Sequence, residues 1–421
     1  MSEILQNLFS GQFGQAVLQW GQQGLSALPW WGVLLAALGM TQLTIVSVTL
    51  YLHRHSAHRA LELHPVLKHL FRAWLWLSTA MNTREWTAVH RRHHAFCETE
   101  RDPHSPRIYG IRKVLLEGAE LYREGADADT VARYGKGTPD DWMERHVYSA
   151  WPNLGIALML LINLALFGVI GLTVWAVQML WIPIFAAGVI NGIGHYWGYR
   201  NFECPDAATN VVPWGLLVGG EELHNNHHTY PNSAKFSVKP WEIDLGWAWI
   251  RLFQALKLAK PLSTGPVVAR DPARTEIDTN TVWGVLNDRF KVLASYADQV
   301  VKPLVEYEYH RADGASRRLY RRARRLLIRD ESLVDAQGRA QLSHLMAQSP
   351  SLKTIYEFRQ RLVQVCAKRS GSSEEALRAF RQWCLDAEAS GIAALKDFVE
   401  ELKSYTMPNR SAFGQSPAGA A

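Results

Sequence analysis

The sequence predicts an all-α integral membrane protein with few transmembrane helices, followed by a soluble helical domain. Residues 29–52 and 151–199 contain no charged side chain, and they are long enough to cross a bilayer once and twice, respectively. Residues 262–421 are instead rich in charge and contain no apolar run of spanning length. The 17 tryptophans crowd around the apolar stretches, as they do at membrane interfaces. We therefore expect four parts: an interfacial segment 1–28, a membrane-bound domain 29–260, a cytoplasmic helical domain 261–410 and a disordered tail 411–421.

The elements of the membrane-bound part follow from apolar periodicity and charge. Apolar residues recur at helical spacing in 1–28, which is typical of an amphipathic helix at the interface. Arg54 is the first basic residue of the chain and directly follows the first span, so the positive-inside bias puts it in the cytoplasm. The segment 66–82 is amphipathic and predicts an embedded or interfacial helix. Residues 109–149 form a charged cytoplasmic connection, and 151–199 forms a helical hairpin whose two ends both face the cytoplasm.

The C-terminal domain shows helical periodicity over 283–305, 316–329, 341–348, 352–368 and 374–406. Gly371-Ser372-Ser373-Glu374 is a capping signal for the last of these helices. The four cysteines of the chain form no C-x-x-C pair, which argues against a disulfide framework and against a cysteine-based zinc or iron–sulfur site.

Clustered histidines are the strongest chemical signal of the sequence. Nine of them stand beside predicted spans, on the side that we assign to the cytoplasm: His53, His58, His90, His93, His94, His195, His224, His227 and His228. Burying so many neutral imidazoles is costly unless they bind a metal or pair with one another. Nine exceed the needs of a single zinc ion and suit a dinuclear site, for which zinc, iron, copper and nickel remain possible. We expect ordinary structural or surface roles for His55, His64, His69, His146, His310 and His344.

These residues resemble the three histidine boxes of the membrane-bound fatty-acid desaturases, and most of all the acyl-CoA (stearoyl-CoA-type) Δ9 branch. The resemblance spans roughly residues 29–260 and rests on His53-x4-His58, His90-x2-His93-His94, Asp102-Pro103-His104-Ser105, Asn191-x3-His195 and His224-x2-His227-His228. It implies a di-iron centre of two Fe²⁺ ions held by the nine histidines, with Asn191 contributing through a water. It further implies that O2 is the co-substrate and that a saturated acyl chain becomes a cis-alkene.

We also predict residues that orient the histidines and residues that line the acyl tunnel. Metal-bound histidines usually donate their second N–H to a neighbouring acceptor, and our candidates for these partners are Glu98, Asp102, Glu222 and Asn225. By resemblance, Thr41 and Ile45 lie near the closed end of the acyl tunnel, and Trp86 lines it. Bulky substitution at Thr41 is then expected to shorten the preferred chain.

The carrier of the acyl chain stays open at this stage. Animal acyl-CoA enzymes place an Arg-Asp pair directly before the second box, whereas this chain has Ala88-Val89. Long-chain acyl-CoA, acyl-carrier protein and phospholipid-bound chains are therefore all candidates. No cytochrome b5-type or cysteine-ligated donor is fused to the chain, which implies a separate donor of ferredoxin or of ferredoxin/flavin reductase type.

Two other hypotheses compete with a desaturase. A di-iron hydroxylase of alkyl chains uses the same kind of centre, and a His-rich metal transporter would place its ligands inside the spans.

The basic run Arg317–Arg329 favours a solvated helix face beside an anionic leaflet, with phosphate binding as a further possibility. Residues 350–407 weakly resemble helical segments of insertion-sequence transposases, but no catalytic set accompanies them and no nucleic-acid partner is expected. The predicted location is a bacterial inner membrane, with the active site on the cytoplasmic side and membrane lipid as neighbour.

Overall fold

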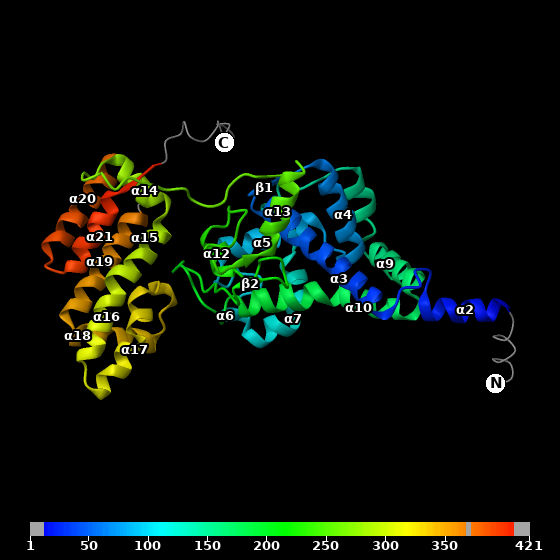
Figure 1. Ribbon diagram of the computed structural model, residues 1–421, viewed down its shortest axis with the longest axis horizontal. Helices are drawn as coiled ribbons and strands as arrows, with labels where there is room; N and C mark the ends of the chain where they lie inside the picture. Colours follow the sequence, from blue (N-terminus) through cyan, green and yellow to red (C-terminus); the bar gives the residue numbers. More distant parts are fainter. Residues whose placement is uncertain (1–11, 368–371, 408–421) are drawn as a thin grey trace. The chain divides into compact units, whose positions relative to one another are not determined.

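The chain forms two compact, mostly helical units (Figure 1). This computed structural model describes residues 12–367 and 372–407. The first unit comprises 1–200 and 206–265, and the second comprises 201–205 and 266–421. Within the predicted interfacial segment, helix α2 (Gln12–Gln23) is present. The remainder of that prediction over 1–11, and the predicted disordered tail 411–421, lie outside the described residues.

The first predicted span is a single long helix that changes its winding near its end. Helix α3 (Trp30–Val46) continues without a break into the π-helical segment η1 (Ser47–Ala57). Together Trp30–Ala57 is long and apolar enough to cross a membrane. The predicted amphipathic helix follows as α4 (Pro65–Thr79), which begins at the N-cap residue His64 and packs against both η1 and α9.

The predicted hairpin is also present. It consists of α9 (Pro152–Phe167), a 3₁₀ turn η3 (Gly168–Ile170), α10 (Gly171–Trp181), the π-helical η4 (Ile182–Ile190) and the short α11 (Asn191–Ile193). The chain reverses at Gly168, whose φ of 67° is a conformation that glycine adopts without steric cost. Large apolar side chains on α9 and α10 are exposed, among them Leu161, Leu172 and Leu180. Such a surface suits lipid, and Pro152–Ile193 is the second candidate membrane-spanning segment.

Shorter elements connect these helices and carry the histidines. They are α5 (Thr83–Phe96), α6 (Pro106–Tyr109), α7 (Ile111–Gly125), α8 (Ala128–Tyr134), η2 (Glu144–Tyr148), α12 (His224–Thr229) and α13 (Leu245–Ala255). The expectation of a purely helical fold misses a few short strands. In the first unit β1 (Leu61–Leu63) pairs antiparallel with β4 (Ala259–Pro261), and β2 (Trp214–Gly215) pairs parallel with β3 (Ile243–Asp244). These ladders join segments that are far apart in sequence.

A buried ion pair fixes the end of the first span against the later part of the unit. Both side chains of the Arg54–Asp244 pair have an exposed fraction of 0%, and Arg54 Nη2 donates to Asp244 Oδ1 over 2.8 Å. The same guanidinium donates to the carbonyl oxygens of Ala234 and Gly219. Arg54 is thus a core residue, although its position in the sequence suggested a charge at the membrane surface.

The second unit is a helical domain with its own core. Its helices are α14 (Thr279–Asn287), α15 (Arg289–Tyr296), η5 (Ala297–Val301), α16 (Lys302–Arg311), α17 (Gly314–Ile328), η6 (Glu331–Leu333), α18 (Ala336–Gln348), α19 (Pro350–Ala367), α20 (Ser373–Ala389) and α21 (Ala393–Lys403). One short antiparallel ladder pairs β5 (Ala269–Arg270) with β6 (Tyr405–Thr406). Trp383, Phe380 and Phe398 are among the buried side chains of the core.

Two helix boundaries of this domain differ from the prediction. The segment 374–406 is two helices rather than one, because Gly391 adopts a φ of 75° between them. The segment 283–305 is divided at Asp288, whose backbone leaves the helical region at φ −121° and ψ 41°. The predicted cap is confirmed: the Ser372 hydroxyl accepts a hydrogen bond from the Glu375 amide.

Candidate metal centre

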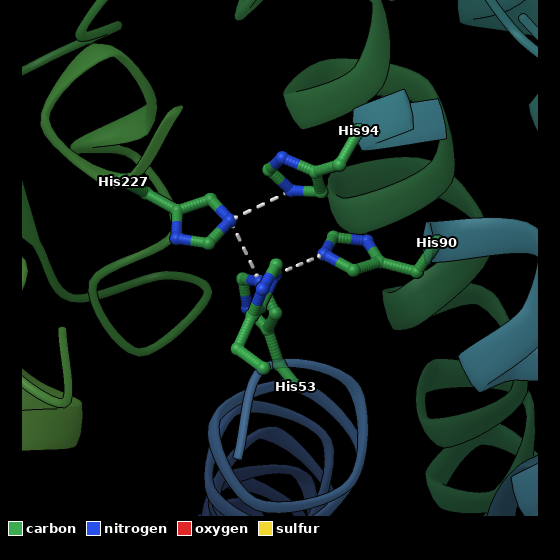
Figure 2. Close-up of side chains that lie close together, drawn as sticks. His53, His90, His94 and His227 are labelled. Carbon is green, nitrogen blue, oxygen red and sulfur yellow. Dashed lines mark hydrogen bonds between the residues drawn. The ribbon is translucent and has the colours of Figure 1, made fainter. Parts of the chain in front are cut away.

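Five of the nine histidines converge on one point. His53 comes from η1, His58 caps that segment, His90 and His94 lie one turn apart on α5, and His227 comes from α12. One ring nitrogen of each lies within 4.8 Å of those of the other four. Figure 2 shows His227 on one side of His53 and the two α5 rings on the other. The Nε2 atoms of His53 and His227 are 2.9 Å apart, and those of His94 and His227 are 3.0 Å apart.

The other four histidines form an adjacent group. His93, His195 and His228 offer ring nitrogens within 4.8 Å of one another, together with the sulfur of Cys97. His224 joins them, because its Nε2 lies 2.9 Å from Nε2 of His195. The rings of His94 and His228 stack with centroids 4.3 Å apart, so the two groups are direct neighbours. All nine predicted ligands are therefore gathered in two clusters, of five and four.

The protonation state of these rings suits metal binding. Burial, reinforced by the neighbouring imidazoles, holds the pKa of six rings well below the usual histidine value, namely those of His58, His90, His94, His224, His227 and His228. Neutral rings keep a lone pair, and two facing Nε2 atoms can share at most one proton. Nε2 of His227 faces two other ring nitrogens, so hydrogen bonds alone do not satisfy the five-histidine group. Electron-pair acceptors at the two convergence points, such as metal ions, would satisfy these atoms.

Carboxylates orient the rings from outside. Nδ1 of His53 lies 2.7 Å from Glu221, that of His93 2.9 Å from Asp102, that of His195 3.0 Å from Glu98 and that of His228 3.3 Å from Asp206. A proton on Nδ1 donates to the carboxylate and leaves Nε2 as the free ligand atom. Although burial opposes it, the charge of Asp102 raises the pKa of His93.

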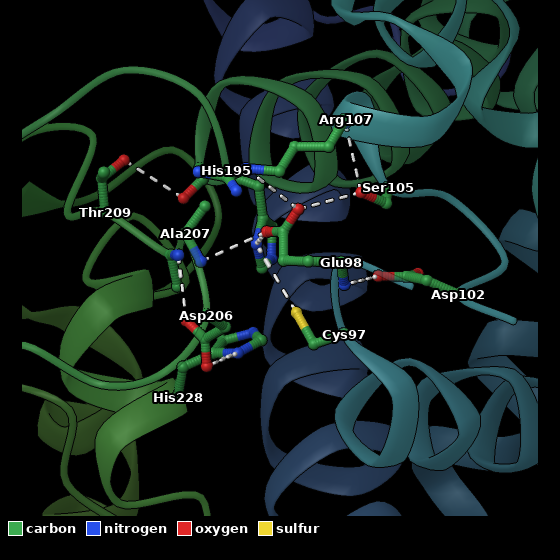
Figure 3. Close-up of polar contacts among 12 residues, drawn as sticks. Cys97, Glu98, Asp102, Ser105, Arg107, His195, Asp206, Ala207, Thr209 and His228 are labelled. Carbon is green, nitrogen blue, oxygen red and sulfur yellow. Dashed lines mark hydrogen bonds and ion pairs between the residues drawn. The ribbon is translucent and has the colours of Figure 1, made fainter. Parts of the chain in front are cut away.

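Glu98 reaches its position through an unusual backbone conformation. It follows the end of α5 with a φ of 65°, a region that residues with a Cβ rarely adopt. Its carboxylate accepts from His195 Nδ1 and from the Ser105 hydroxyl, while its amide donates to Asp102 Oδ2 over 2.9 Å (Figure 3). Such strain persists where surrounding contacts over-determine it, as they do here.

The four predicted partners of the histidines fall in two classes. Glu98 and Asp102 contact ring nitrogens, as described above. The Glu222 carboxylate instead accepts backbone N–H groups of the turn Leu217–Gly220, and the Asn225 amide donates to the Ala208 carbonyl. Glu221 and Asp206 are not among the predicted partners. Glu221 adjoins Glu222, so a pair of acidic residues before the third box was the available signal.

A cavity of about 680 Å³ opens beside the histidines and is mostly apolar. His53, His90 and His224 line one part of it, together with Asn191. The rest is lined mainly by apolar residues of α9, α10 and η4, among them Ile156, Trp175, Met179, Ile182 and Ala186. An elongated apolar molecule bound in this cavity could therefore lie beside rings of both histidine groups.

The predicted substrate residues occupy different places around this cavity. Trp86 lines it and stacks on His90 with ring centroids 4.8 Å apart. Thr41 and Ile45 are buried in α3 and do not line the cavity, although Met40 lies 3.8 Å from Gln178, next to the lining residue Met179. Asn191 lines the cavity, and its role as a water-mediated ligand stays a prediction.

Three further residues, His55, His104 and Cys97, lie near the two histidine groups. His55 contacts the Leu61 carbonyl through Nδ1 and belongs to neither group. His104 was not among the predicted ligands. It lines the cavity, and its ring is tilted against that of His93 with centroids 4.3 Å apart. Burial and the neighbouring His93 lower its pKa to about 3. Cys97 Sγ lies 3.8 Å from Nδ1 of His195 and 3.9 Å from Nε2 of His93, which the cysteine spacing did not suggest.

The chain was compared with known protein families and curated proteins. The family model described as fatty acid desaturase matches residues 28–256, and a second model, described as transposase, matches residues 283–415. The sn-1 stearoyl-lipid 9-desaturase of Synechocystis sp. is 31% identical over 228 residues, which cover 53% of this chain and 69% of that protein. The sn-1 stearoyl-lipid 9-desaturase of Anabaena variabilis is 29% identical, covering 57% and 83%, respectively. An acyl-CoA 5-desaturase of Anemone leveillei is 31% identical, covering 51% and 66%.

Removing one converging imidazole should remove metal. We expect His90→Ala to lower the metal bound per chain by about half, because the five-histidine group loses a ligand while the four-histidine group keeps all of its own. Metal content of the purified full chain, measured by elemental mass spectrometry, checks this. His69→Ala is the matched control, because His69 is exposed on α4 and belongs to neither histidine group. Equal metal content in both variants would contradict the assignment.

Two adjacent glutamates offer a sharper test of the orienting carboxylates. Glu221→Gln should weaken metal binding roughly 10–100-fold, because the amide cannot hold the His53 tautomer as the carboxylate does. Glu222→Gln should lower thermal stability but leave metal affinity near that of the parent, because its partners are backbone amides. Competition with a metal chelator, followed for both variants, measures the affinities. A larger loss in Glu222→Gln than in Glu221→Gln would overturn the division of roles.

Proposed function

Because the chain belongs to the fatty acid desaturase family, we propose that it catalyses O2-dependent desaturation of a saturated long-chain acyl group to a cis-monounsaturated one. The observation that carries the proposal is that residues of both histidine clusters line one mostly apolar cavity. In each turnover two hydrogens leave adjacent CH2 groups. A donor supplies two electrons, the solvent supplies two protons, and one O2 is reduced to two waters.

Two iron ions are the metals that we propose for the two clusters. An all-imidazole set with neutral rings fits iron, although the same donors also bind zinc, copper and nickel. The five-histidine group would hold one ion and His93, His195, His224 and His228 the other. Bound there, iron supplies the redox chemistry that breaking an unactivated C–H bond requires.

The protein's own contribution is to place the chain and keep the reacting carbons dry. Ile182, Ala186 and Ile190 of η4 form an apolar wall of the cavity, and Trp86 covers His90. An acyl chain extended along this wall exposes a methylene pair to the rings of His53, His90 and His224. Glu221, Asp102 and Glu98 keep the rings in one tautomer, so the ligand set does not have to reorganise during turnover.

The acyl carrier that we propose is coenzyme A, with Δ9 as the position of the new double bond. The resemblance to the acyl-CoA branch supports this carrier, and one similar plant protein is named an acyl-CoA 5-desaturase. A glycerolipid-bound chain is the second candidate. Two observations favour it: both bacterial relatives are named stearoyl-lipid desaturases, and Ala88 and Val89 are 0% and 2% exposed, so neither offers a polar contact to a CoA group.

We further propose a multi-pass protein of a bacterial inner membrane whose metal centre faces the cytoplasm. Two candidate spans support the membrane location, and the charged connection 109–149 supports the side. A separate electron donor, of ferredoxin or of ferredoxin/flavin reductase type, would deliver the two electrons, because no donor motif is present in the sequence.

Reconstitution with iron tests the reaction and the carrier together. We expect about two irons per chain and, with O2 and a reducing system, a cis-alkene from a saturated substrate. Stearoyl-CoA and stearoyl-phosphatidylglycerol in separate reactions decide the carrier, and mass spectrometry of the intact products reads it. An alcohol as product would indicate a hydroxylase. A protein that holds zinc and forms no oxygen-dependent product would contradict the proposed function.

The apolar end of the cavity should set chain length. Met179→Trp is expected to shift the products toward shorter chains at similar total turnover, because the larger side chain takes up part of the apolar cavity that we propose for the acyl chain. Thr41→Trp tests whether the tunnel extends beyond the cavity to α3, as the resemblance implies. Chromatography of products from a mixture of acyl lengths measures both. Unchanged product lengths in Met179→Trp would contradict this placement of the chain.

A further inference from the structure

One face of α17 in the second unit carries six arginines. Arg317, Arg318, Arg321, Arg322, Arg324 and Arg325 are all exposed. At 3.6 residues per turn they fall within an arc of roughly 160°, over about 12 Å of helix axis. A positive surface of this density repels itself unless anions neutralise it.

Protein carboxylates leave most of this face uncompensated. Arg324 pairs with Asp298 of η5 over 2.7 Å. The other five arginines have no ion-pair partner within the residues that the structure describes. Among the acidic residues nearby, Asp313 caps the start of α17 and Glu308 accepts from the Ser349 hydroxyl. Five of the six positive charges on this face therefore have no carboxylate partner among the described residues, although Arg317 also donates to the Ala312 carbonyl oxygen.

The opposite side of α17 excludes insertion into lipid as the mode of binding. Tyr320, Ala323 and Leu327 are buried in the core of the second unit, so the apolar side of this helix is already covered. Only the guanidinium groups are available to a partner. Attraction must then be electrostatic, and it must weaken as salt increases.

We propose that this arginine face binds anionic phospholipid head groups at the surface of the bilayer in which the first unit resides. Clusters of four to eight basic side chains on one helix are typical of such surfaces. Guanidinium groups also match phosphate oxygens in geometry and charge. The inference depends on the membrane location but not on the reaction catalysed.

The covalent connection favours a lipid surface over other polyanions. β4 ends at Pro261 of the first unit, and β5 already belongs to the second unit from Ala269. The seven residues between them span at most about 25 Å when fully extended. A domain tethered this closely to a membrane-bound unit meets a high local concentration of phosphate head groups. The match of residues 283–415 to a transposase model makes nucleic acid the alternative partner. The experiment must distinguish binding to nucleic acid from binding to lipid head groups.

Arginine footprinting on the full chain tests the proposal. The protein is placed in lipid nanodiscs of phosphatidylcholine, with or without phosphatidylglycerol, and is labelled with phenylglyoxal. We expect labelling of Arg317, Arg318, Arg321, Arg322 and Arg325 to slow several-fold in the discs that contain phosphatidylglycerol, and to recover at high salt. Arg378, an exposed arginine of α20, is the internal control and should label equally in both discs.

Variants keep the test independent of folding. Replacing Arg317, Arg318, Arg321 and Arg322 with glutamine should abolish the lipid-dependent protection of Arg325, whereas four lysines at the same positions should retain it. Equal labelling of Arg325 in the two discs for the parent protein overturns the proposal. So does protection that appears only when a DNA or RNA duplex is added. Failure of the proposed desaturase function would show instead as missing alkene product, with the footprint unchanged.

Discussion

Nine clustered imidazoles direct ring nitrogens toward two neighbouring points, and much of the first unit serves that arrangement. The rings come from four stretches of chain, the most distant separated by 175 residues in sequence between His53 and His228. Burial lowers the pKa of six of these rings well below the usual histidine value, and it also deprives their nitrogens of water. Carboxylates lie at the outer Nδ1 atoms of four rings, and metal ions bound at the two points would take the inner lone pairs.

Rigid connections between distant segments hold these rings in place. His53 directly precedes Arg54, whose buried pair with Asp244 joins η1 to the start of α13. Removing one partner of such a pair typically costs about 3–5 kcal/mol, because the remaining charge is left in the interior. Asp244 also accepts the amides of Phe236 and Trp247, so the segment after the third histidine box is anchored to the same point. A shift of η1 would therefore disturb the metal ligands and the wall behind them together.

The sequence was most informative where chemistry is local and least where contacts are remote. Spacing alone placed His90, His93 and His94 on one helix, and the uncharged run placed the hairpin around Gly168. The division of the nine rings into five and four was not predictable, because it depends on which way α5 faces α12. Arg54 was interpreted as a surface charge because its partner lies 190 residues away. Glu221 rather than Glu222 faces His53 because a backbone turn at Leu217–Gly220 takes the carboxylate of Glu222, and no local pattern reveals that choice.

The two metal positions are unequal in a way that bears on their chemistry. In the five-histidine group the described carboxylate contact is that of His53 with Glu221, whereas three rings of the four-histidine group contact Glu98, Asp102 and Asp206. A carboxylate on Nδ1 makes an imidazole a stronger electron-pair donor. The four-histidine group therefore has more negative charge beside its rings, and as a metal position it would stabilise a more highly charged ion than the five-histidine group. His53, His90 and His224 bring both groups to the wall of the same cavity, so an acyl chain bound there, as we propose, would meet two centres of different electron richness rather than a symmetric pair.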